Sequence, residues 1–262
     1  QNKQTMFFIV RHGERADKAF LSKEKLDIEL SFDPQLTALG MEMGARTGDE
    51  IASFRAELLK RDSLDDPEAS GRDIYVISSP FLRCMQTASR LAERLGVTSL
   101  MVEEGISEFL HRSWFETDPI PLLTINSMDK EDFKRVHKVN DFEYPPSILA
   151  PEYPETDRWA RYVKSFDFYT NNFFINNKSD RKPIVVMVTH GYALPAVSSH
   201  LLGKHMHPRA MYCSYNRYTW DSMTKFWRVN STMEAKHVKY NQHLRDFETP
   251  LPKKASRQKQ EK

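Results

Sequence analysis

The stretch Met6-Phe7-Phe8-Ile9-Val10-Arg11-His12-Gly13-Glu14-Arg15 decides the fold, because five apolar residues run directly into a basic turn. This pattern predicts a buried strand whose following side chains lie at the carboxyl edge of a sheet, where open α/β folds bind ligands. A histidine between arginines suits phosphate chemistry, since arginine grips phosphate oxygens in pairs. Arginine charge also lowers the histidine pKa, which frees a ring nitrogen to attack phosphorus. Taken alone, the string also fits a solvated basic loop.

Two further apolar runs end in polar residues in the same way. Ile74-Tyr75-Val76-Ile77-Ser78-Ser79-Pro80 is followed by an amphipathic helix with Arg83 in its first turn. A cation there opposes the helix dipole, so we expect Arg83 to hold an anion, although a surface arginine is the alternative. Ile184-Val185-Val186-Met187-Val188-Thr189 is the most continuously apolar run and ends in His190-Gly191. A strand buried on both faces has this composition.

An acid is also needed, because the leaving oxygen of a phosphate ester takes up a proton. Glu108 lies between Ile106 and the pair Phe109-Leu110, and this apolar setting predicts a raised carboxyl pKa. Glu103 and Glu104 stand before a glycine and are expected to be exposed. Glu108 is therefore the candidate proton donor.

Together these motifs resemble those of the histidine phosphatase superfamily, in its phosphoglycerate-mutase-like branch (branch 1). The motifs follow the family's order: Arg11-His12-Gly13, Asp33-Pro34-Gln35-Leu36-Thr37-Ala38-Leu39-Gly40, Ser78-Ser79-Pro80 with Arg83, Glu108, and His190-Gly191. Within the branch, other stretches are similar to the phosphatase domains of the suppressors of T-cell receptor signalling and to ecdysteroid-phosphate phosphatases: Arg15 and residues 82–87, 105–109, 153–156 and 212–214. The resemblance covers roughly residues 6–221.

The resemblance implies a three-layer α/β/α fold with a mostly parallel central sheet and a phosphohistidine mechanism. It implies that His12 is the nucleophile and that Glu108 protonates the leaving group and then activates water. The phosphate pocket would be lined by Arg11, Arg15, Arg83 and His190. These roles agree with the residue chemistry, in which positive charge stabilises the transition-state oxygens. Neither a cofactor nor a metal is expected.

Two departures from the patterns of the family bear on the reaction and on the branch. Mutases of the family usually carry a Trp-Asn pair where this chain has Ala16-Asp17, which argues for a phosphatase. The acid-phosphatase branch has His-Asp where this chain has His190-Gly191, which disfavours that branch. The T-cell relatives often have His-Ala there, a difference that leaves the role of the histidine intact. The charged stretch of residues 18–32 is expected as a loop or short helix at the pocket mouth, where it influences substrate choice.

Composition fits a single α/β domain. The chain has 262 residues, of which 40% are hydrophobic, and a net charge of +2, so no nucleic-acid partner is expected. Cys84 and Cys213 lack metal or redox spacing and are expected as reduced thiols. No apolar run has membrane-spanning length or resembles a signal peptide, so a cytoplasmic location is expected. The sequence begins at Gln1 rather than Met, which leaves room for an upstream domain.

The expected organisation is one phosphatase domain over residues 1–252 and a basic tail over residues 253–262. The proline-rich stretch of residues 114–154 is interpreted as an irregular lid, with simple coverage of the core edge as the alternative. A first long helix is expected from Thr37 to about Arg61. A second, over residues 155–177, carries an aromatic stripe expected to be core: Trp159, Tyr162, Phe166, Tyr169 and Phe173.

Three classes of function stay open. The leading hypothesis is a metal-independent phosphatase acting on phosphate monoesters, either small molecules or phosphoproteins. The alternatives are a phosphoglycerate mutase or bisphosphatase, and a phosphatase-fold subunit of a larger assembly; a homodimer is compatible with each. His200, His205 and His207 have no carboxylate or thiolate near them in sequence, so we expect no zinc site there.

Overall fold

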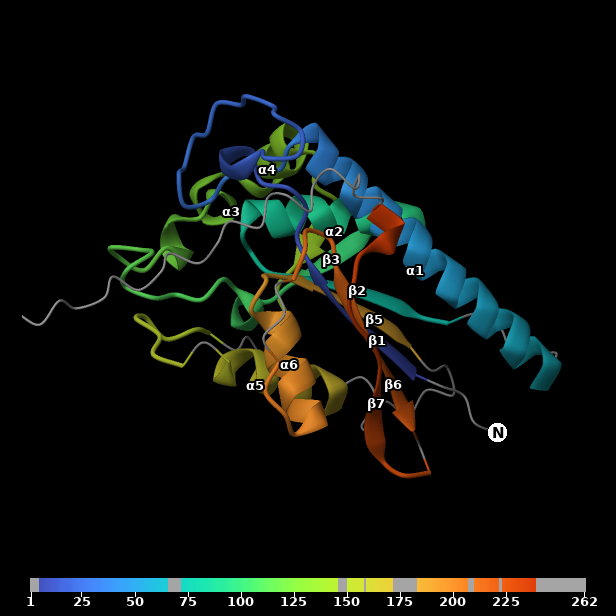
Figure 1. The fold of residues 1–262 in the computed structure, drawn as a ribbon. Helices are drawn as coiled ribbons and strands as arrows, with labels where there is room; N and C mark the ends of the chain where they lie inside the picture. The colour runs from blue at the N-terminus through green and yellow to red at the C-terminus, as the bar shows by residue number, and fades with distance from the viewer. Residues whose placement is uncertain are drawn as a thin grey trace, which may run out of the picture.

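The computed structural model describes residues 5–65, 72–145, 150–157, 159–171, 183–206, 210–221 and 223–238. Strands and helices alternate through most of the chain, as Figure 1 shows. The strands are β1 (Thr5–Arg11), β2 (Ile74–Ser78), β3 (Ser99–Val102), β4 (Asp141–Glu143), β5 (Ile184–Thr189), β6 (Tyr215–Asp221) and β7 (Phe226–Glu234). The helices are α1 (Ala38–Asp65), α2 (Leu82–Leu95), α3 (Thr124–Ser127), α4 (Lys130–His137), α5 (Ala160–Thr170) and α6 (Ala193–Leu202).

The described strands form one mixed, mostly parallel sheet. Its order is β4-β3-β2-β5-β1-β6-β7, and the strands from β4 to β1 are all parallel to their neighbours. The pairs β1–β6 and β6–β7 are antiparallel. All six residues of β5 are buried, as the continuously apolar run predicts for a strand covered on both faces.

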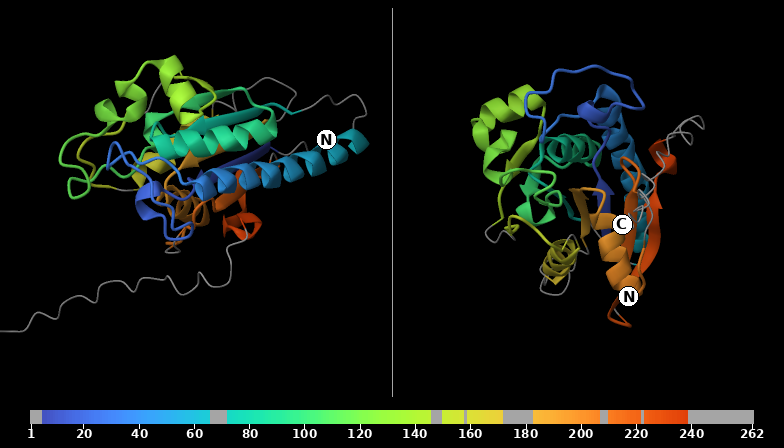
Figure 2. Two further views of the ribbon diagram at one scale, coloured as in Figure 1. Left: turned by 90° about the horizontal axis from the view of Figure 1, so that it is seen from above. Right: turned by 60° about the vertical axis from the view of Figure 1, so that its left-hand side comes forward.

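Helices cover both faces of the sheet and give the expected three layers (Figure 2). Because side chains alternate along a strand, β1 contributes to two cores. Met6, Phe8 and Val10 pack with side chains of α1 and α2, whereas Phe7 and Ile9 pack with side chains of α5 and α6. The predicted α/β class and layer arrangement are confirmed.

Helix α1 begins where the sequence predicts. The Thr37 hydroxyl accepts a hydrogen bond from the Gly40 amide at 3.0 Å, which satisfies a free donor of the first turn. The helix runs to Asp65, past the expected end at Arg61. It packs along α2, and Gly48 lies so close that a Cβ there would stand 2.8 Å from the Leu91 carbonyl oxygen.

The stretch of residues 114–154 is more regular than predicted. It contains α3, α4 and β4, and β4 pairs with β3 at the edge of the sheet. Phe133 of α4 and Phe142 of β4 are buried in the core beside α2. Alternating apolar residues in such short elements give a weak periodic signal, so the sequence suggested irregular packing where the structure has secondary structure.

Helix α5 begins at Ala160, later than the helix predicted over residues 155–177, and the predicted end lies outside the described residues. Its buried aromatic residues Tyr162, Phe166 and Tyr169 belong to the core, as expected. Trp159 precedes the helix, packs against this core while partly buried, and also lines a cavity. Phe173, His207 and the tail of residues 253–262 lie outside the described residues.

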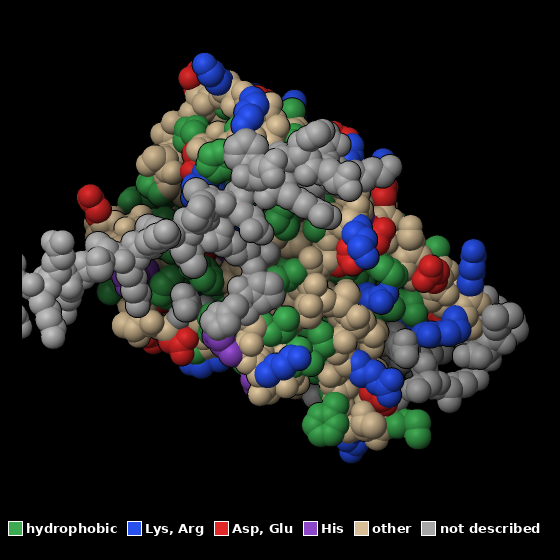
Figure 3. All heavy atoms as spheres, viewed as in Figure 1, with side chains coloured by type: hydrophobic (Ala, Val, Ile, Leu, Met, Phe, Trp, Pro, Cys, Tyr) green, Lys and Arg blue, Asp and Glu red, His purple; other side chains and the backbone are tan. Residues whose placement is uncertain are grey.

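Acidic and basic side chains are interspersed on the face of the molecule shown in Figure 3, in keeping with the small net charge. Among the described residues, no helix combines the length and the hydrophobicity needed to cross a membrane.

Candidate active site

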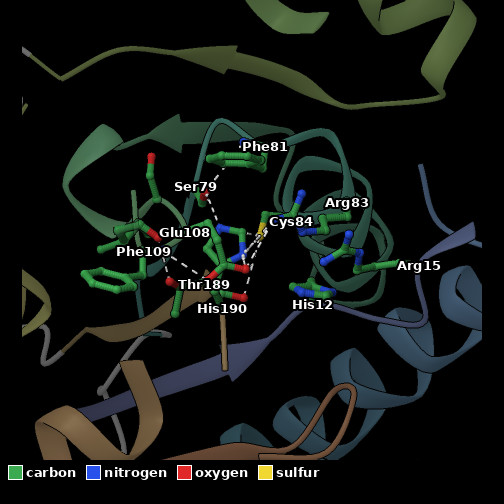
Figure 4. A network of polar contacts seen from close by, with 12 residues as sticks. His12, Arg15, Ser79, Phe81, Arg83, Cys84, Glu108, Phe109, Thr189 and His190 are labelled. Atoms are coloured by element: carbon green, nitrogen blue, oxygen red, sulfur yellow. Dashed lines mark hydrogen bonds and ion pairs between the residues drawn. The ribbon is translucent and has the colours of Figure 1, made fainter. Parts of the chain in front are cut away.

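The carboxyl ends of three neighbouring strands meet at one edge of the sheet. His12 follows β1, Ser79 follows β2 and His190 follows β5, the strand between them. Arg83 reaches the same place from the first turn of α2, and Glu108 reaches it from the segment after β3. Figure 4 shows these side chains gathered in one network. One atom each of His12, Glu108 and His190 lies within 4.8 Å of the others.

His12 is buried and carries a free ring nitrogen. Its Nδ1 lies 2.8 Å from the Gly13 carbonyl oxygen, which can only accept, so Nδ1 carries the proton and Nε2 does not. Burial, followed by the charges of Arg83 and Arg11, holds the pKa of His12 well below its usual value. The ring is therefore neutral, as the basic flanking residues predict.

The turn after His12 is fixed by close backbone contact. The Gly13 amide donates to the Thr87 hydroxyl at 3.0 Å, which ties the turn to α2. A Cβ on Gly13 would lie 2.4 Å from the Gly40 carbonyl oxygen of α1. Only glycine fits between these elements.

Glu14 anchors the loop that follows, a role that the sequence did not reveal. Its buried carboxylate accepts hydrogen bonds from the Leu21 amide at 2.6 Å and from the Thr37 hydroxyl at 2.9 Å. It thus joins the loop to the start of α1. Charged residues in a turn are usually solvated, so the burial of Glu14 could not be predicted from the sequence.

Arg83 is almost fully buried, and its guanidinium contacts both Glu108 and His190. Its guanidinium lies over the Phe81 ring at 4.5 Å and donates from Nη2 to Glu108 Oε2 at 3.3 Å. Among the described residues its buried Nε has no hydrogen-bond partner. A buried guanidinium with an unused donor fits the expectation that Arg83 holds an anion.

Arg11 and Arg15 complete the basic lining. Arg11 donates from Nη1 to the Ala210 carbonyl at 2.5 Å and lies over the Tyr212 ring at 4.4 Å. Arg15 forms a two-point ion pair with Asp17, with Nε–Oδ1 and Nη2–Oδ2 distances of 2.8 and 2.6 Å. Arg11 is thus fixed by its surroundings, whereas Arg15 is held by one partner at the cavity rim.

His190 is bound on both ring nitrogens. Nε2 lies 2.9 Å from the Ser79 hydroxyl, and Nδ1 lies 3.3 Å from Glu108 Oε2. Burial lowers the pKa of His190 to about 4, and Glu108 opposes that shift only in part. A neutral His190 satisfies these two contacts if Nδ1–H donates to Glu108 and Nε2 accepts from Ser79. Arg83 Nη2, which also lies 3.3 Å from Nδ1, is then a neighbouring donor and not a hydrogen-bond partner of that nitrogen.

The expected raised pKa of Glu108 is not what the structure shows. Burial acts to raise the pKa of Glu108, but the combined lowering by His190, Arg83 and the Phe109 amide is larger. The pKa of Glu108 therefore lies below its usual range. The apolar sequence neighbours of Glu108 do not reveal these partners. A phosphate dianion beside the carboxylate would repel its charge and shift its pKa upward.

The other two glutamates of this stretch also differ from expectation. Glu103 is fully buried, accepts from the Gly105 amide at 2.7 Å and from the Tyr169 hydroxyl at 2.5 Å. Glu104 is half-buried, and burial raises its pKa. Tyr169 is distant in sequence, which is why the burial of Glu103 was missed.

Asp33 is a further residue whose role the sequence did not predict. It is buried and accepts from the Leu82 amide at the start of α2 at 2.7 Å. Its other oxygen accepts from the amide and the hydroxyl of Thr124, at the start of α3, at 3.0 and 2.8 Å. Asp33 thus caps the helix that carries Arg83, although it lies 49 residues before Leu82 in the chain.

A cavity of about 750 Å³ opens over these groups. Arg11, Arg15, Arg83 and Glu108 lie among its lining residues, with Lys18 and Phe32 from the charged loop of residues 18–32. Its apolar wall includes Trp114, Phe115, Trp159, Tyr192 and Pro195. The charged loop thus reaches the cavity, as expected.

Both described cysteines are free and buried, in agreement with the sequence. Cys84 Sγ lies 3.5 Å from His190 Nε2, and burial raises its pKa strongly. Burial raises the pKa of Cys213 to about 12. Both sulfurs are therefore protonated near neutral pH.

The site suits an anion better than a cation. His12, Glu108 and His190 offer three atoms at metal-ligand spacing, but Arg83 contacts two of these residues directly and would repel a cation. Of the other histidines considered, His200 is exposed and His205 stacks on Trp159 at 4.4 Å.

Comparison with known proteins defines the class. Residues 7–231 match the histidine phosphatase superfamily (branch 1), and the chain belongs to this family. It is 26% identical over 213 residues to the mouse ubiquitin-associated and SH3 domain-containing protein A, which agrees with the resemblance found in the sequence. The match covers 74% of this chain and 32% of the mouse protein, so the chain spans about a third of that relative.

Solved structures share the fold at low identity. The ecdysone phosphate phosphatase of Bombyx mori, solved with tungstate, superposes with a TM-score of 0.53 at 17% identity, covering 87% of this chain and 93% of that one. A phosphoserine phosphatase of Entamoeba histolytica, solved with 3-phosphoglyceric acid, gives a TM-score of 0.53 at 17% identity, covering 89% and 99%. These matches establish the fold.

Proposed function

We propose that this chain is a phosphatase that hydrolyses phosphate monoesters through a phosphohistidine intermediate. The observation that carries the proposal is His12, a buried neutral imidazole with no proton on Nε2, which lies within electrostatic reach of the three arginines that line the cavity. A neutral imidazole is a nucleophile, and fixed cations stabilise the charge on a transferring phosphoryl group. The family supports this choice, and the phosphatases named above share the fold.

In the first step His12 Nε2 attacks phosphorus and the bond to the ester oxygen breaks. Arg11, Arg15 and Arg83 bind the non-bridging oxygens. The further donor is the His190 Nδ1–H, which faces Glu108 Oε2 when no phosphate is bound. Glu108 in its acid form gives its proton to the departing oxygen. The alcohol leaves, and the phosphoryl group remains on His12.

In the second step water cleaves the phosphorus–nitrogen bond. The Glu108 carboxylate takes a proton from the attacking water, which restores its acid form and releases inorganic phosphate from His12. The arginines supply the positive charge that a metal supplies in other phosphatases, so the proposed reaction is metal-independent.

Location and cover of the site are part of the same proposal. Two free buried thiols suit a reducing compartment, which supports a cytoplasmic location. Trp114 and Phe115 line the cavity from the start of the stretch of residues 114–154, which supports its role as a lid. Within that stretch, α4 and β4 cover the core edge through Phe133 and Phe142.

The direct test is to trap the phosphoryl group during turnover of radiolabelled 4-nitrophenyl phosphate. We expect acid-labile, base-stable phosphate on His12, and a His12→Ala variant that folds but loses at least about a thousandfold in activity. His200→Ala, at an exposed histidine of α6, is the matched control and should retain both properties. Full activity in His12→Ala would overturn the mechanism.

A second test separates hydrolysis from phosphoryl transfer to another hydroxyl. Asp17 occupies the place of the mutase Trp-Asn pair and binds Arg15, so the rim is polar and open to water. We expect release of inorganic phosphate without a bisphosphoglycerate primer, inhibition by vanadate, and no loss of activity on treatment with a chelator. Rapid interconversion of phosphoglycerates with little phosphate release would favour the mutase alternative.

A further inference from the structure

The segment that carries Glu108 has little backbone support of its own. It follows the short 3-10 helix η2 (Glu104–Ile106), and residues 107–111 have no regular secondary structure. Most of the residues from Gly105 to Leu110 are nevertheless buried, so their carbonyl oxygens need hydrogen-bond donors. A neighbouring strand would supply amides; here side chains of other elements supply most of the donors.

Arg161, in the first turn of α5, donates to three carbonyls of this segment. Nη1 lies 2.8 Å from the Gly105 oxygen and 3.1 Å from the Ser107 oxygen. Nη2 lies 2.9 Å from the oxygen of Glu108 itself. One planar guanidinium thus fixes the backbone on both sides of Ser107.

Glu155 holds that guanidinium and closes the arrangement. Its Oε1 and Oε2 accept from Arg161 Nε and Nη2 at 2.6 and 2.8 Å. The same carboxylate accepts from the Leu110 amide at 2.7 Å, and the Glu155 amide donates to the Leu110 carbonyl at 2.9 Å. The Arg161 and Glu155 side chains are only 10% and 7% exposed.

Neighbouring hydroxyls donate to two of the carbonyls that Arg161 binds and to the Ile106 carbonyl, which Arg161 does not bind. Tyr162 donates to Ser107 at 2.8 Å, Ser165 to Gly105 at 2.9 Å, and Thr189 of β5 to Ile106 at 2.6 Å. Because Thr189 adjoins His190 in the chain, the segment is also tied to the strand that carries His190.

We propose that the Arg161–Glu155 pair positions Glu108 for proton transfer. The inference rests on the proposed function, in which Glu108 is the acid. A buried ion pair gains little net stability over apolar packing, but it defines geometry at both of its ends. A displacement of about 1 Å in a catalytic group can cost about a hundredfold in rate, so this pair would matter for chemistry although it contacts no substrate.

The test compares two esters that differ only in the leaving group, phenyl phosphate (poor) and 4-nitrophenyl phosphate (good). The values compared are kcat/KM, which report on the phosphorylation step. Arg161→Lys keeps the charge but cannot reach three carbonyls and a carboxylate at once. We expect about a tenfold to hundredfold loss for phenyl phosphate and less than about a threefold loss for 4-nitrophenyl phosphate.

A double-mutant cycle with Glu108→Gln makes the test specific. If Arg161 acts through Glu108, Arg161→Lys adds no further loss for phenyl phosphate once Glu108→Gln is present. An equal loss in both backgrounds would overturn the proposal. Arg72→Lys is the matched control, because Arg72 forms a similar buried pair with Asp62 (Nε–Oδ2 2.7 Å) away from the cavity. It should lower the unfolding midpoint without changing the ratio for the two esters.

Tyr162→Phe removes one donor to Ser107 and serves if Arg161→Lys does not fold. It should lower the ratio of kcat/KM for phenyl phosphate to kcat/KM for 4-nitrophenyl phosphate by about twofold to fivefold, the scale of one hydrogen bond. An unchanged ratio in both variants would overturn the proposal. Failure of the proposed function is recognised separately, since His12→Ala would then stay active whatever the cycle shows.

Discussion

His12 and His190 stand at the ends of neighbouring parallel strands, whereas Glu108 and Arg15 stand on segments without regular secondary structure. We call the first group, with Gly13, the strand-built side and the second, with Asp17, the loop-built side. Backbone hydrogen bonds between β1 and β5 fix the strand-built side. Side chains hold the loop-built side, through Arg161 for Glu108 and Asp17 for Arg15. Substitutions on the strand-built side should therefore cause large losses of activity and stability. Substitutions on the loop-built side should cause smaller, graded changes.

The largest effect is expected from Gly13→Ala on the strand-built side. The new methyl group would lie 2.4 Å from the Gly40 carbonyl oxygen, and the atoms that it meets are backbone atoms of α1. We expect a loss of about 3 kcal/mol or more in the free energy of unfolding and more than about a hundredfold in activity. Denaturant unfolding and 4-nitrophenyl phosphate turnover measure both.

Gly191→Ala provides the contrast for Gly13→Ala. Its methyl group would lie 3.6 Å from Arg11 Nε, an ordinary contact. Activity within about fivefold of the original is expected, which is the scale of a tolerated substitution. If Gly13→Ala lost as little activity and stability as Gly191→Ala, the strand-built side would not be rigid.

An intermediate effect is expected from pH. Burial lowers the pKa of His190 to about 4 and that of His12 below its usual value, so the unfolded chain binds more protons than the folded one below about pH 6.5. The contribution of the two neutral histidines to the free energy of unfolding is therefore fully present above pH 6.5 and decreases as the pH falls toward 4. A loss of roughly 2 kcal/mol or more is expected between pH 7 and 4.5.

Unfolding by denaturant at these two pH values checks this expectation. His190→Asn should lose less stability than the original protein over the same interval, and His200→Asn should lose as much. Equal losses in all three proteins would show that the buried histidines do not control the pH dependence.

The smallest effect is expected from Asp17→Asn on the loop-built side. Arg15 and Asp17 have side chains that are 17% and 23% exposed, so their ion pair is worth about 1 kcal/mol at most. Release of Arg15 should tighten competitive inhibition by inorganic phosphate by about twofold to fivefold. Asp49→Asn, at the exposed partner of Arg94, is the control. Weaker phosphate inhibition would mean that Asp17 presents Arg15 to the ligand.

The same division explains what the sequence predicted. Strand ends can be located from apolar runs, so the meeting of His12, Arg83 and His190 followed from the order of the strands and the motifs. The mostly parallel sheet and the start of α1 followed in the same way. The family resemblance pointed to Glu108, and the structure places it beside His190 and Arg83.

Contacts between distant segments could not be predicted. The lowered pKa of Glu108, the burial of Glu103 beside Tyr169 and the support from Arg161 all depend on side chains far along the chain. The short elements α3 and β4 were also missed, because each is too short for a periodic pattern.

Asp33 gives the stretch of residues 114–154 a thermodynamic link to the pocket. One carboxylate serves the amino ends of two helices, α2 through Leu82 and α3 through Thr124. Local unfolding of α3 therefore removes partners from a carboxylate that also orders the first turn around Arg83, and hydrogen exchange in the two helix starts should be correlated. In this chain, a deletion or exchange at α3 would therefore also alter the electrostatics at the helix that presents Arg83.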